Sequence, residues 1–462
     1  MPPFEALRIE TDRVDLHGLE FTRKGSLMSE MLERVFGVSK ANSTVRTELL
    51  AGLATFLTMA YITVVNPAIL TDGTGMEFGA VFTATIIAAV VGTLIMGLWA
   101  NWPVGLAPGL GLNAYFTYTV ILGDGYTYQQ ALTAVFVAGV VFIILSVSPT
   151  RKYIINSIPS SMKLGIGAGI GLFLAIIGFE NAGIVVDNPA TLVGLGDVAS
   201  WPVLLAGLGF IIMAVLSHRK VPGAVVIGIL AISIIAWIIG EADLEGVAGS
   251  VPNPEHAFQL DFSVVATATF VGIAFAFLFV DFLDTAGTLT SIANLTGRVK
   301  EDGEIEDIDR TLLADSSATV VGALAGTSNT TSYIESGAGI AEGGRTGLTA
   351  VTVAVLFAAC LFFAPLAQSV PAFATAPALI FIATYFLRNI KDIDWDDISE
   401  YVPATLAAII MPLTYSIAYG IAIGFVSYVL IKALSGKGRS LNYASIGLAA
   451  VSVLFFVVSV NS

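Results

Sequence analysis

The chain has 462 residues, of which 56% are hydrophobic and 12% charged, and its mean hydropathy is +0.85. Such a composition excludes a soluble domain, and apolar runs of about 20 residues predict membrane-spanning helices rather than a barrel. The net charge of −14 excludes a nucleic-acid binder. The acidic residues crowd the tails and loops, which fits either an ordinary solvated surface or a halophilic protein. One cysteine allows no intrachain disulfide, and the three histidines lie outside the apolar runs, so no metal or cofactor is expected.

In chain order, the apolar runs predict an all-α polytopic membrane protein with fourteen spans. We place these spans at residues 50–72, 79–100, 104–122, 129–148, 162–181, 200–217, 222–240, 263–295, 311–326, 330–343, 346–367, 372–390, 400–415 and 417–436. A last apolar stretch, 441–460, either spans the bilayer or lies in its interface.

The distribution of basic residues supports this count. If the N-terminus is cytoplasmic, every Lys and Arg falls on the cytoplasmic side, and loops on the other side, such as residues 241–261, contain none. This is the asymmetry of the positive-inside rule. We therefore expect a multi-pass protein of the cell membrane with a cytoplasmic N-terminus.

Two spans look interrupted. Residues 103–120 hold two prolines and three glycines before Asn113, and residues 325–347 hold a Ser/Thr/Asn run followed by Glu335 and more glycines. Irregular backbone at membrane depth survives only where it is buried in protein or lines a cavity. One interrupted span is third in the first seven and the other is third in the second seven. This arrangement indicates an inverted-repeat transporter with its site near the midplane.

The eighth span carries a polar stripe. Asp281, Asp284, Thr285 and Thr288 are spaced so that they share one helix face, which should point into the protein. A carboxylate in hydrocarbon must be paired, hydrogen-bonded or protonated. A polar ligand, a cation or a proton is the expected partner, although a purely structural role for either Asp remains open.

Glu335 is a third buried acid, and no Lys or Arg lies deep in any span. Three acids without a buried base favour a proton, Na⁺ or a polar neutral ligand over an anion. Asn113 either donates and accepts hydrogen bonds to a flat heterocycle such as a nucleobase or joins two helices. Tyr333 is close enough in sequence to stack on such a ligand. Asp315 and Glu342 are expected near the cytoplasmic face, in structural roles.

Other function classes fit less well. An intramembrane aspartyl protease needs two acids on different helices, whereas the Asp pair here lies on one helix. Asp281 with Glu335 is the one arrangement that would imitate such a dyad. An anion transporter would need a buried Arg or a neutral site, and a channel would not need the two interrupted spans. We therefore expect a transporter without enzymatic activity.

At these residues the chain resembles a known family. The segments GLGLNAYF, FLFVDFLDTAGTL, GTSNTTSYIESGAGIAEGGRTGLTAV and MPLTYSIAYGIAIGF are similar to motifs of the nucleobase/ascorbate transporter (xanthine/uracil permease) superfamily. They look like its AzgA-like branch, the adenine/guanine/hypoxanthine permeases. The resemblance covers about residues 30 to 436. It implies fourteen spans in two inverted repeats of seven, with short strands in spans 3 and 10.

The resemblance also implies a division into a core and a gate domain. The expected parts are a cytoplasmic tail (1–48), the core (49–150 and 263–368), the gate (151–242 and 369–436) and a C-terminal hydrophobic segment (437–462).

In function, the resemblance implies import of hypoxanthine, adenine or guanine by proton symport, with an elevator motion and a homodimeric assembly in the lipid bilayer. The family's substrate-binding residues fall on Asp281, Glu335 and Asn113, and the proton-coupling candidates are Asp281, Asp284 and Glu335. Uracil-carrying relatives have a histidine where this chain has Thr285, which favours a purine. Thr288 and Tyr333 are secondary candidates. The alternatives left open are xanthine, uracil or an inorganic anion as substrate, and Na⁺ in place of H⁺.

Overall fold

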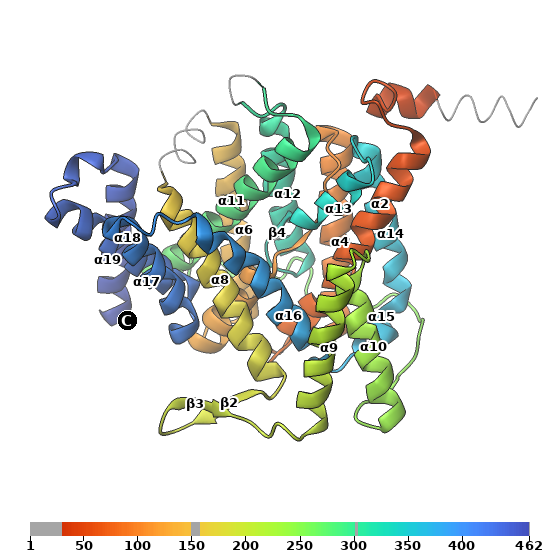
Figure 1. Ribbon diagram of the computed structural model, residues 1–462, viewed down its shortest axis with the longest axis horizontal. Helices are drawn as coiled ribbons and strands as arrows, with labels where there is room; N and C mark the ends of the chain where they lie inside the picture. Colours follow the sequence, from red (N-terminus) through yellow and green to blue (C-terminus); the bar gives the residue numbers. More distant parts are fainter. Residues whose placement is uncertain (1–29, 149–157, 301–303, 462) are drawn as a thin grey trace, which may run out of the picture.

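The computed structural model describes residues 30–148, 158–300 and 304–461 (Figure 1). Most of the expected N-terminal tail, together with Arg151 and Lys152 of the charge pattern, lies outside the described residues. The elements of the first part are α2 (Val45–Met59), α3 (Ile62–Leu70), α4 (Phe78–Ile95), η1 (Met96–Ala100), β1 (Leu106–Pro108), α5 (Leu110–Ala114), η2 (Tyr115–Gly123), α6 (Tyr128–Val147), α8 (Ser160–Asn181), β2 (Val185–Asn188), β3 (Leu192–Leu195), α9 (Trp201–His218) and α10 (Ala224–Ile239).

The second part begins with the longest of the described helices, α11. Its elements are α11 (Ala268–Thr296), α12 (Ile308–Ala325), β4 (Thr330–Ser332), η3 (Ile334–Ser336), α13 (Gly337–Ala341), α14 (Gly347–Cys360), η4 (Leu361–Phe363), α15 (Ala364–Gln368), α16 (Ala372–Leu387), η5 (Arg388–Asp392), α17 (Ile398–Thr414), α18 (Ile417–Leu434), η6 (Gly438–Ser440) and α19 (Tyr443–Asn461).

The helices coincide with the predicted spans. The span expected at 129–148 is α6, and the span expected at 162–181 is α8. In the described part of the chain, nine helical stretches are long and apolar enough to cross a membrane, and shorter apolar helices include α10 and α17. The protein is thus an all-helical polytopic membrane protein with short strands. The crossing of the bilayer by all fourteen segments stays a prediction.

The helices pack in two groups, which α11 contacts on either side. In one group, α12 packs against α4 and α6, and α14 packs against α2 and α4. In the other, α8 packs against α16 and α17, and α17 packs against α18. In Figure 1 the dark-blue α17, α18 and α19 lie at one side of the molecule, and α2 and α14 lie at the other. Between them, α11 contacts α6, α12, α18 and α19.

Glycines explain the close approach of α8 to its partners. A Cβ at Gly165 would lie 2.5 Å from the Ala404 carbonyl oxygen, and one at Gly171 would lie 2.6 Å from Phe386 Cβ. Backbones that approach this closely gain van der Waals contact that lipid cannot replace. The apolar, glycine-rich sequence of this span therefore specifies a helix buried between α16 and α17.

One element has no counterpart in the sequence prediction. The strands β2 and β3 form an antiparallel hairpin between α8 and α9, with Val185 opposite Leu195. In Figure 1 this hairpin lies at the edge of the molecule. Its strands are half-exposed or exposed, so they lack the apolar alternation by which a buried strand is recognised.

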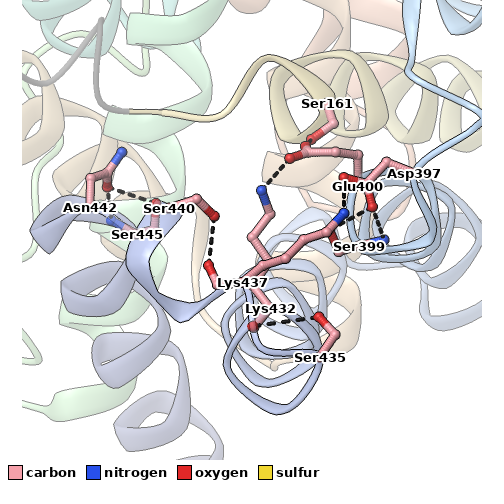
Figure 2. Close-up of polar contacts among 10 residues, drawn as sticks. All are labelled: Ser161, Asp397, Ser399, Glu400, Lys432, Ser435, Lys437, Ser440, Asn442 and Ser445. Atoms are coloured by element: carbon pink, nitrogen blue, oxygen red, sulfur yellow. Dashed lines mark hydrogen bonds and ion pairs between the residues drawn. The ribbon is translucent and has the colours of Figure 1, made fainter.

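A polar cluster joins the ends of α8, α17 and α18 (Figure 2). Glu400 accepts hydrogen bonds from Lys432 and Ser161, and the side chains of the ion pair are 20% and 7% exposed, respectively. Nearby, Lys437 pairs with Asp397 at 2.7 Å. The Lys437 ammonium and the hydrogen bonds from Ser399 lower the pKa of Asp397 to about 2.

The buried pair should be the stronger of the two. Replacing Lys432 with Met leaves the Glu400 carboxylate without a counter-charge, so we expect a loss of about 3 kcal/mol in the free energy of unfolding. Lys437→Met is the matched control, because its pair is more exposed and should contribute little. Thermal melting of the purified protein measures both. Equal melting temperatures for the two variants would show that the buried pair has no special role.

Candidate functional site

The two interrupted spans meet at a pair of three-residue strands. β1 and β4 are antiparallel, with Leu106 opposite Ser332 and Pro108 opposite Thr330. The pairing extends beyond the strands, since Gly109 N–H donates to the Asn329 carbonyl at 2.9 Å. In Figure 1, β4 lies near the middle of the molecule. The short strands expected in spans 3 and 10 are therefore present, and backbone at this depth is paired as a membrane interior requires.

Side chains and glycines hold this crossing in place. Thr93 Oγ1 contacts both backbone groups of Leu106, at 2.9 Å and 3.1 Å. The Ser336 hydroxyl accepts from Gly105 N–H at 3.0 Å, and Tyr333 Oη donates to the Pro108 carbonyl at 2.5 Å. A Cβ at Gly105 would lie 2.6 Å from the sulfur of Met59, so a larger residue there would require the buried Met59 side chain to move. The glycine- and proline-rich sequence thus builds a rigid crossing rather than a flexible break.

A large cavity of about 1170 Å³ lies against this crossing. Asp284 on α11 and Glu335 on η3 both line it, and both are half-buried. The cavity is also lined by Thr331 of β4 and by the backbone of Gly109 and Gly111 next to β1. Two acids, a threonine and two glycines therefore line one space from the two interrupted spans and α11.

Glu335 is held from the first span. Tyr61 Oη donates to Glu335 Oε1 at 2.9 Å, and Thr58 Oγ1 donates to the Glu335 carbonyl at 3.3 Å. Both residues also line the cavity and sit where α2 gives way to α3. Asp284, in contrast, makes no hydrogen bond to any described residue, so its carboxylate is available to a ligand.

Asp281 lies on the same helix but faces away from the cavity. Its side chain is 1% exposed, and Oδ2 accepts from Thr319 at 2.8 Å and from Asn329 Nδ2 at 3.0 Å. Its other oxygen, Oδ1, has no partner among the described residues. Of the two acids on α11, the structure thus brings Asp284 to Glu335 and places Asp281 behind the strand pair.

Asp315 forms a second buried network. It accepts from the Ser332 N–H at 2.7 Å, from the Ser332 hydroxyl at 2.6 Å and from Thr285 at 2.6 Å. Thr285 also contacts the Thr331 hydroxyl at 3.0 Å. The structural role expected for Asp315 fits these contacts, because its side chain is fully buried against β4, and its position near the cytoplasmic face stays a prediction. Its role is to fix the strand that leads to Glu335.

The remaining candidates are distributed around the crossing. Thr288 and Tyr333 line the cavity, and Glu342 lines its outer part. Asn113 is fully buried, and its Oδ1 accepts from Ser328, while its Nδ2 has no partner among the described residues. Asn113 does not line the cavity, so the asparagine joins α5 to the segment before β4.

Sequence reasoning missed Tyr61 and Thr58, the two residues that hold Glu335. Both belong to an apolar span in which a single Thr or Tyr gives no pattern that stands out. Their role depends on the packing of α2 and α3 against η3, which brings residues 61 and 335 together. Residues so far apart in the sequence cannot be recognised as neighbours without the structure.

The arrangement suits a polar, uncharged ligand that donates hydrogen bonds. Two carboxyl groups accept hydrogen bonds from N–H donors, and a carboxyl group that carries a proton also donates one. Among the described residues, neither Asp284 nor Glu335 forms an ion pair with a cation. An anion would therefore meet like charge at this end of the cavity.

The fold is similar to that of known transporters. The transmembrane domain of the cyanobacterial bicarbonate transporter BicA superposes with a TM-score of 0.63 at 17% sequence identity, and the match covers 81% of this chain and 96% of that chain. At this level of identity the likeness shows the fold alone. The fold class is therefore an all-helical polytopic membrane fold like that of BicA, with short paired strands.

The sequence defines the family. A family model described as "Permease family", that of the xanthine/uracil permeases, matches residues 46–423, and the chain belongs to this family of transporters. It is 44% identical to the guanine/hypoxanthine permease PbuO of Bacillus subtilis, over 92% of this chain and 99% of that protein. It is 41% identical to the adenine permease AdeQ of Escherichia coli, over 92% of this chain and 96% of that protein. The resemblance noted in the motifs is confirmed, and the protein is a transporter rather than an enzyme.

Proposed function

We propose that this protein is a secondary active transporter that imports purine nucleobases by proton symport. The observation that carries the proposal is the pair of acids, Asp284 and Glu335, that face one cavity from α11 and from the segment after β4. Purine bases carry ring N–H groups, and adenine and guanine also carry an amino group, so carboxyl oxygens can accept hydrogen bonds from them. The relatives support the same substrate class, since they are named guanine/hypoxanthine and adenine permeases.

The binding site in this proposal is centred on Asp284 and Glu335. Tyr61 orients Glu335, and the peptide groups beside β1 and β4 lie where they can bind the second edge of the base. The resemblance assigned the span-8 binding role to Asp281, and that assignment stays a prediction. The geometry favours Asp284, because Asp281 is already hydrogen-bonded to Thr319 and Asn329 outside the cavity.

The proposed coupling of proton and substrate movement follows from the charges of the two cavity acids. A proton on one of the two cavity acids removes the repulsion between them and lowers the charge that moves with the loaded site from −2 to −1. The moving part would be the expected core, residues 49–150 and 263–368, against the gate, residues 151–242 and 369–436. The separate packing of α12 with α4 and α6, and of α8 with α16 and α17, supports this division. The elevator motion, the inverted repeats and the homodimer stay predictions.

Sodium coupling is the second candidate. Asp281 Oδ1 and Asn329 Oδ1 are buried oxygen atoms without a hydrogen-bond partner among the described residues. Carboxylate and amide oxygens are the ligand types that hard cations prefer. A Na⁺ ion between these two atoms would neutralise Asp281 as a proton would, so the choice of ion has to be measured directly.

Competition binding tests the substrate class. We expect purified protein to bind radiolabelled hypoxanthine, and we expect adenine and guanine to displace it while uracil and bicarbonate do not. Discrimination of about tenfold or more is expected, because a ligand with the wrong edge leaves a buried acid unpaired. Displacement by uracil or bicarbonate as efficient as displacement by guanine would contradict the purine assignment.

A further inference from the structure

The cavity lining also carries basic residues, three of which are exposed, whereas Asp284 and Glu335 are half-buried. Four basic residues from three different elements line the cavity: Lys163 of α8, Lys220 between α9 and α10, and Arg388 and Lys391 of η5. Lys220, Arg388 and Lys391 make no side-chain hydrogen bond or ion pair with any described residue. These four residues are called the basic rim below.

The helices give the rim a defined distance from the acids. On α8, Ile170 lines the cavity next to Gly111, since a Cβ at Gly111 would lie 2.6 Å from the Ile170 side chain. Lys163 lies seven residues earlier on the same helix, which corresponds to about 10 Å along its axis. Arg388, the first residue of η5, lies the same number of residues after Phe381 of α16, which also lines the cavity. The rim therefore lies roughly one nucleotide length from the strand crossing.

The cavity is also larger than a free base needs. Its volume of about 1170 Å³ is slightly above the range of about 300–1,000 Å³ for small-molecule pockets. A ligand that filled it would carry N–H donors at one end, for Asp284 and Glu335, and negative charge at the other, for the rim. Two acids of the rim region, Glu342 and Asp392, reduce its charge but leave it net positive.

We propose that the cavity binds a purine nucleoside monophosphate, with the base at the acids and the phosphate at the basic rim, and that this ligand inhibits transport. The proposal rests on the purine function above. Lysine and arginine bind phosphate through charge-assisted hydrogen bonds, and arginine can do so with two parallel bonds. The phosphate would have to leave all of these cations before the site could cross, so the nucleotide occupies the site without being carried.

The inhibitor would come from the cell interior. The basic residues that define the rim belong to the side assigned to the cytoplasm by the positive-inside rule. A reaction that attaches a phosphorylated ribose to the imported base produces such a ligand there. Its product would then limit further import of the base, which is a direct form of feedback.

Displacement of bound hypoxanthine from the purified protein tests the proposal. The probes are inosine 5′-monophosphate, inosine, ribose 5-phosphate and inorganic phosphate. We expect the nucleotide to displace hypoxanthine about tenfold more tightly than the nucleoside does, and the two phosphates without a base to be ineffective. The combined variant Lys220→Gln, Arg388→Gln and Lys391→Gln should lose this preference and keep its hypoxanthine affinity within about twofold.

Arg219→Gln is the matched control, because Arg219 is next to Lys220 in sequence but does not line the cavity. Equal displacement by nucleotide and nucleoside, or a preference that survives in the combined variant, would overturn the proposal. The nucleotide-induced rise in melting temperature gives a second readout that needs no hypoxanthine. If hypoxanthine fails to bind but the nucleotide stabilises only proteins with an intact rim, the purine transport function is wrong and the basic site stands. If hypoxanthine fails to bind and the nucleotide stabilises no variant, the transport function and the nucleotide site are both wrong.

Discussion

Glu335→Gln and Asp284→Asn are each expected to reduce hypoxanthine uptake about 100-fold, with normal insertion into the membrane. Each change keeps the size of the side chain but removes the charge and the exchangeable proton. A hydrogen bond to a charged group contributes about 1.5–3 kcal/mol, and its loss in a buried site corresponds to a drop of this size. Uptake per mole of protein in reconstituted vesicles, and binding of hypoxanthine to the same preparations, measure the effect.

Two variants sharpen this test. Glu342→Gln changes an acid of the same cavity outside the proposed base site, so uptake should stay within about twofold. Asp281→Asn separates the two acids of α11, since it alters a residue that lies behind the strands. We expect it to impair transport while hypoxanthine binding persists. Loss of binding in Asp281→Asn together with full binding in Asp284→Asn would instead support the assignment to Asp281 that the family resemblance implies.

Asp315→Ala is expected to destabilise the protein more than any other single change near the site. The substitution leaves the N–H and the hydroxyl of Ser332 and the hydroxyl of Thr285 without their buried acceptor. Unpaired buried polar groups cost about 1–3 kcal/mol each, so a loss of at least about 3 kcal/mol is expected. Hypoxanthine binding should weaken as well, because β4 positions the segment that carries Glu335. Melting of the detergent-solubilised protein, with and without hypoxanthine, measures both effects.

Ser316→Ala is the control for this variant. Ser316 follows Asp315 on α12 and is equally buried, but its hydroxyl bonds only to carbonyl groups of its own helix, including that of Leu312 at 2.8 Å. Its removal should change stability by less than about 1 kcal/mol. If Ser316→Ala and Asp315→Ala melt at the same temperature, the network around β4 does not stabilise the crossing.

Much of the helical framework follows from the sequence. Apolar runs of membrane length, bounded by charged or glycine-rich turns, placed α6 and α8 to within two residues at each end. The strands β1 and β4 were expected only from the family resemblance, because three residues are too few to show an alternating pattern. The hairpin of β2 and β3 was not expected at all, since exposed strands carry no apolar signal.

The site was predictable in composition and not in detail. The polar stripe on α11 was visible as a spacing, and Glu335 was visible as an acid in an interrupted span. Spacing could not decide which of Asp281 and Asp284 faces the cavity, because they lie on nearly the same side of one helix. Hydrogen bonds from Thr319 of α12 and from Asn329, in the segment before β4, hold the Asp281 side chain outside the cavity. The contacts of Asp315 were not predictable for the same reason, since its partners Ser332 and Thr285 become neighbours only in the folded protein.

Uptake of radiolabelled hypoxanthine into vesicles that contain only this protein tests the central claim most directly. The vesicles are given first an inward pH gradient and then an inward Na⁺ gradient. We predict accumulation above equilibrium with the pH gradient alone, and its complete block by excess guanine. Accumulation with the Na⁺ gradient alone would show that sodium, rather than the proton, is the coupling ion, and the substrate assignment would stand. No accumulation under either gradient would contradict the assignment of this permease to purine import.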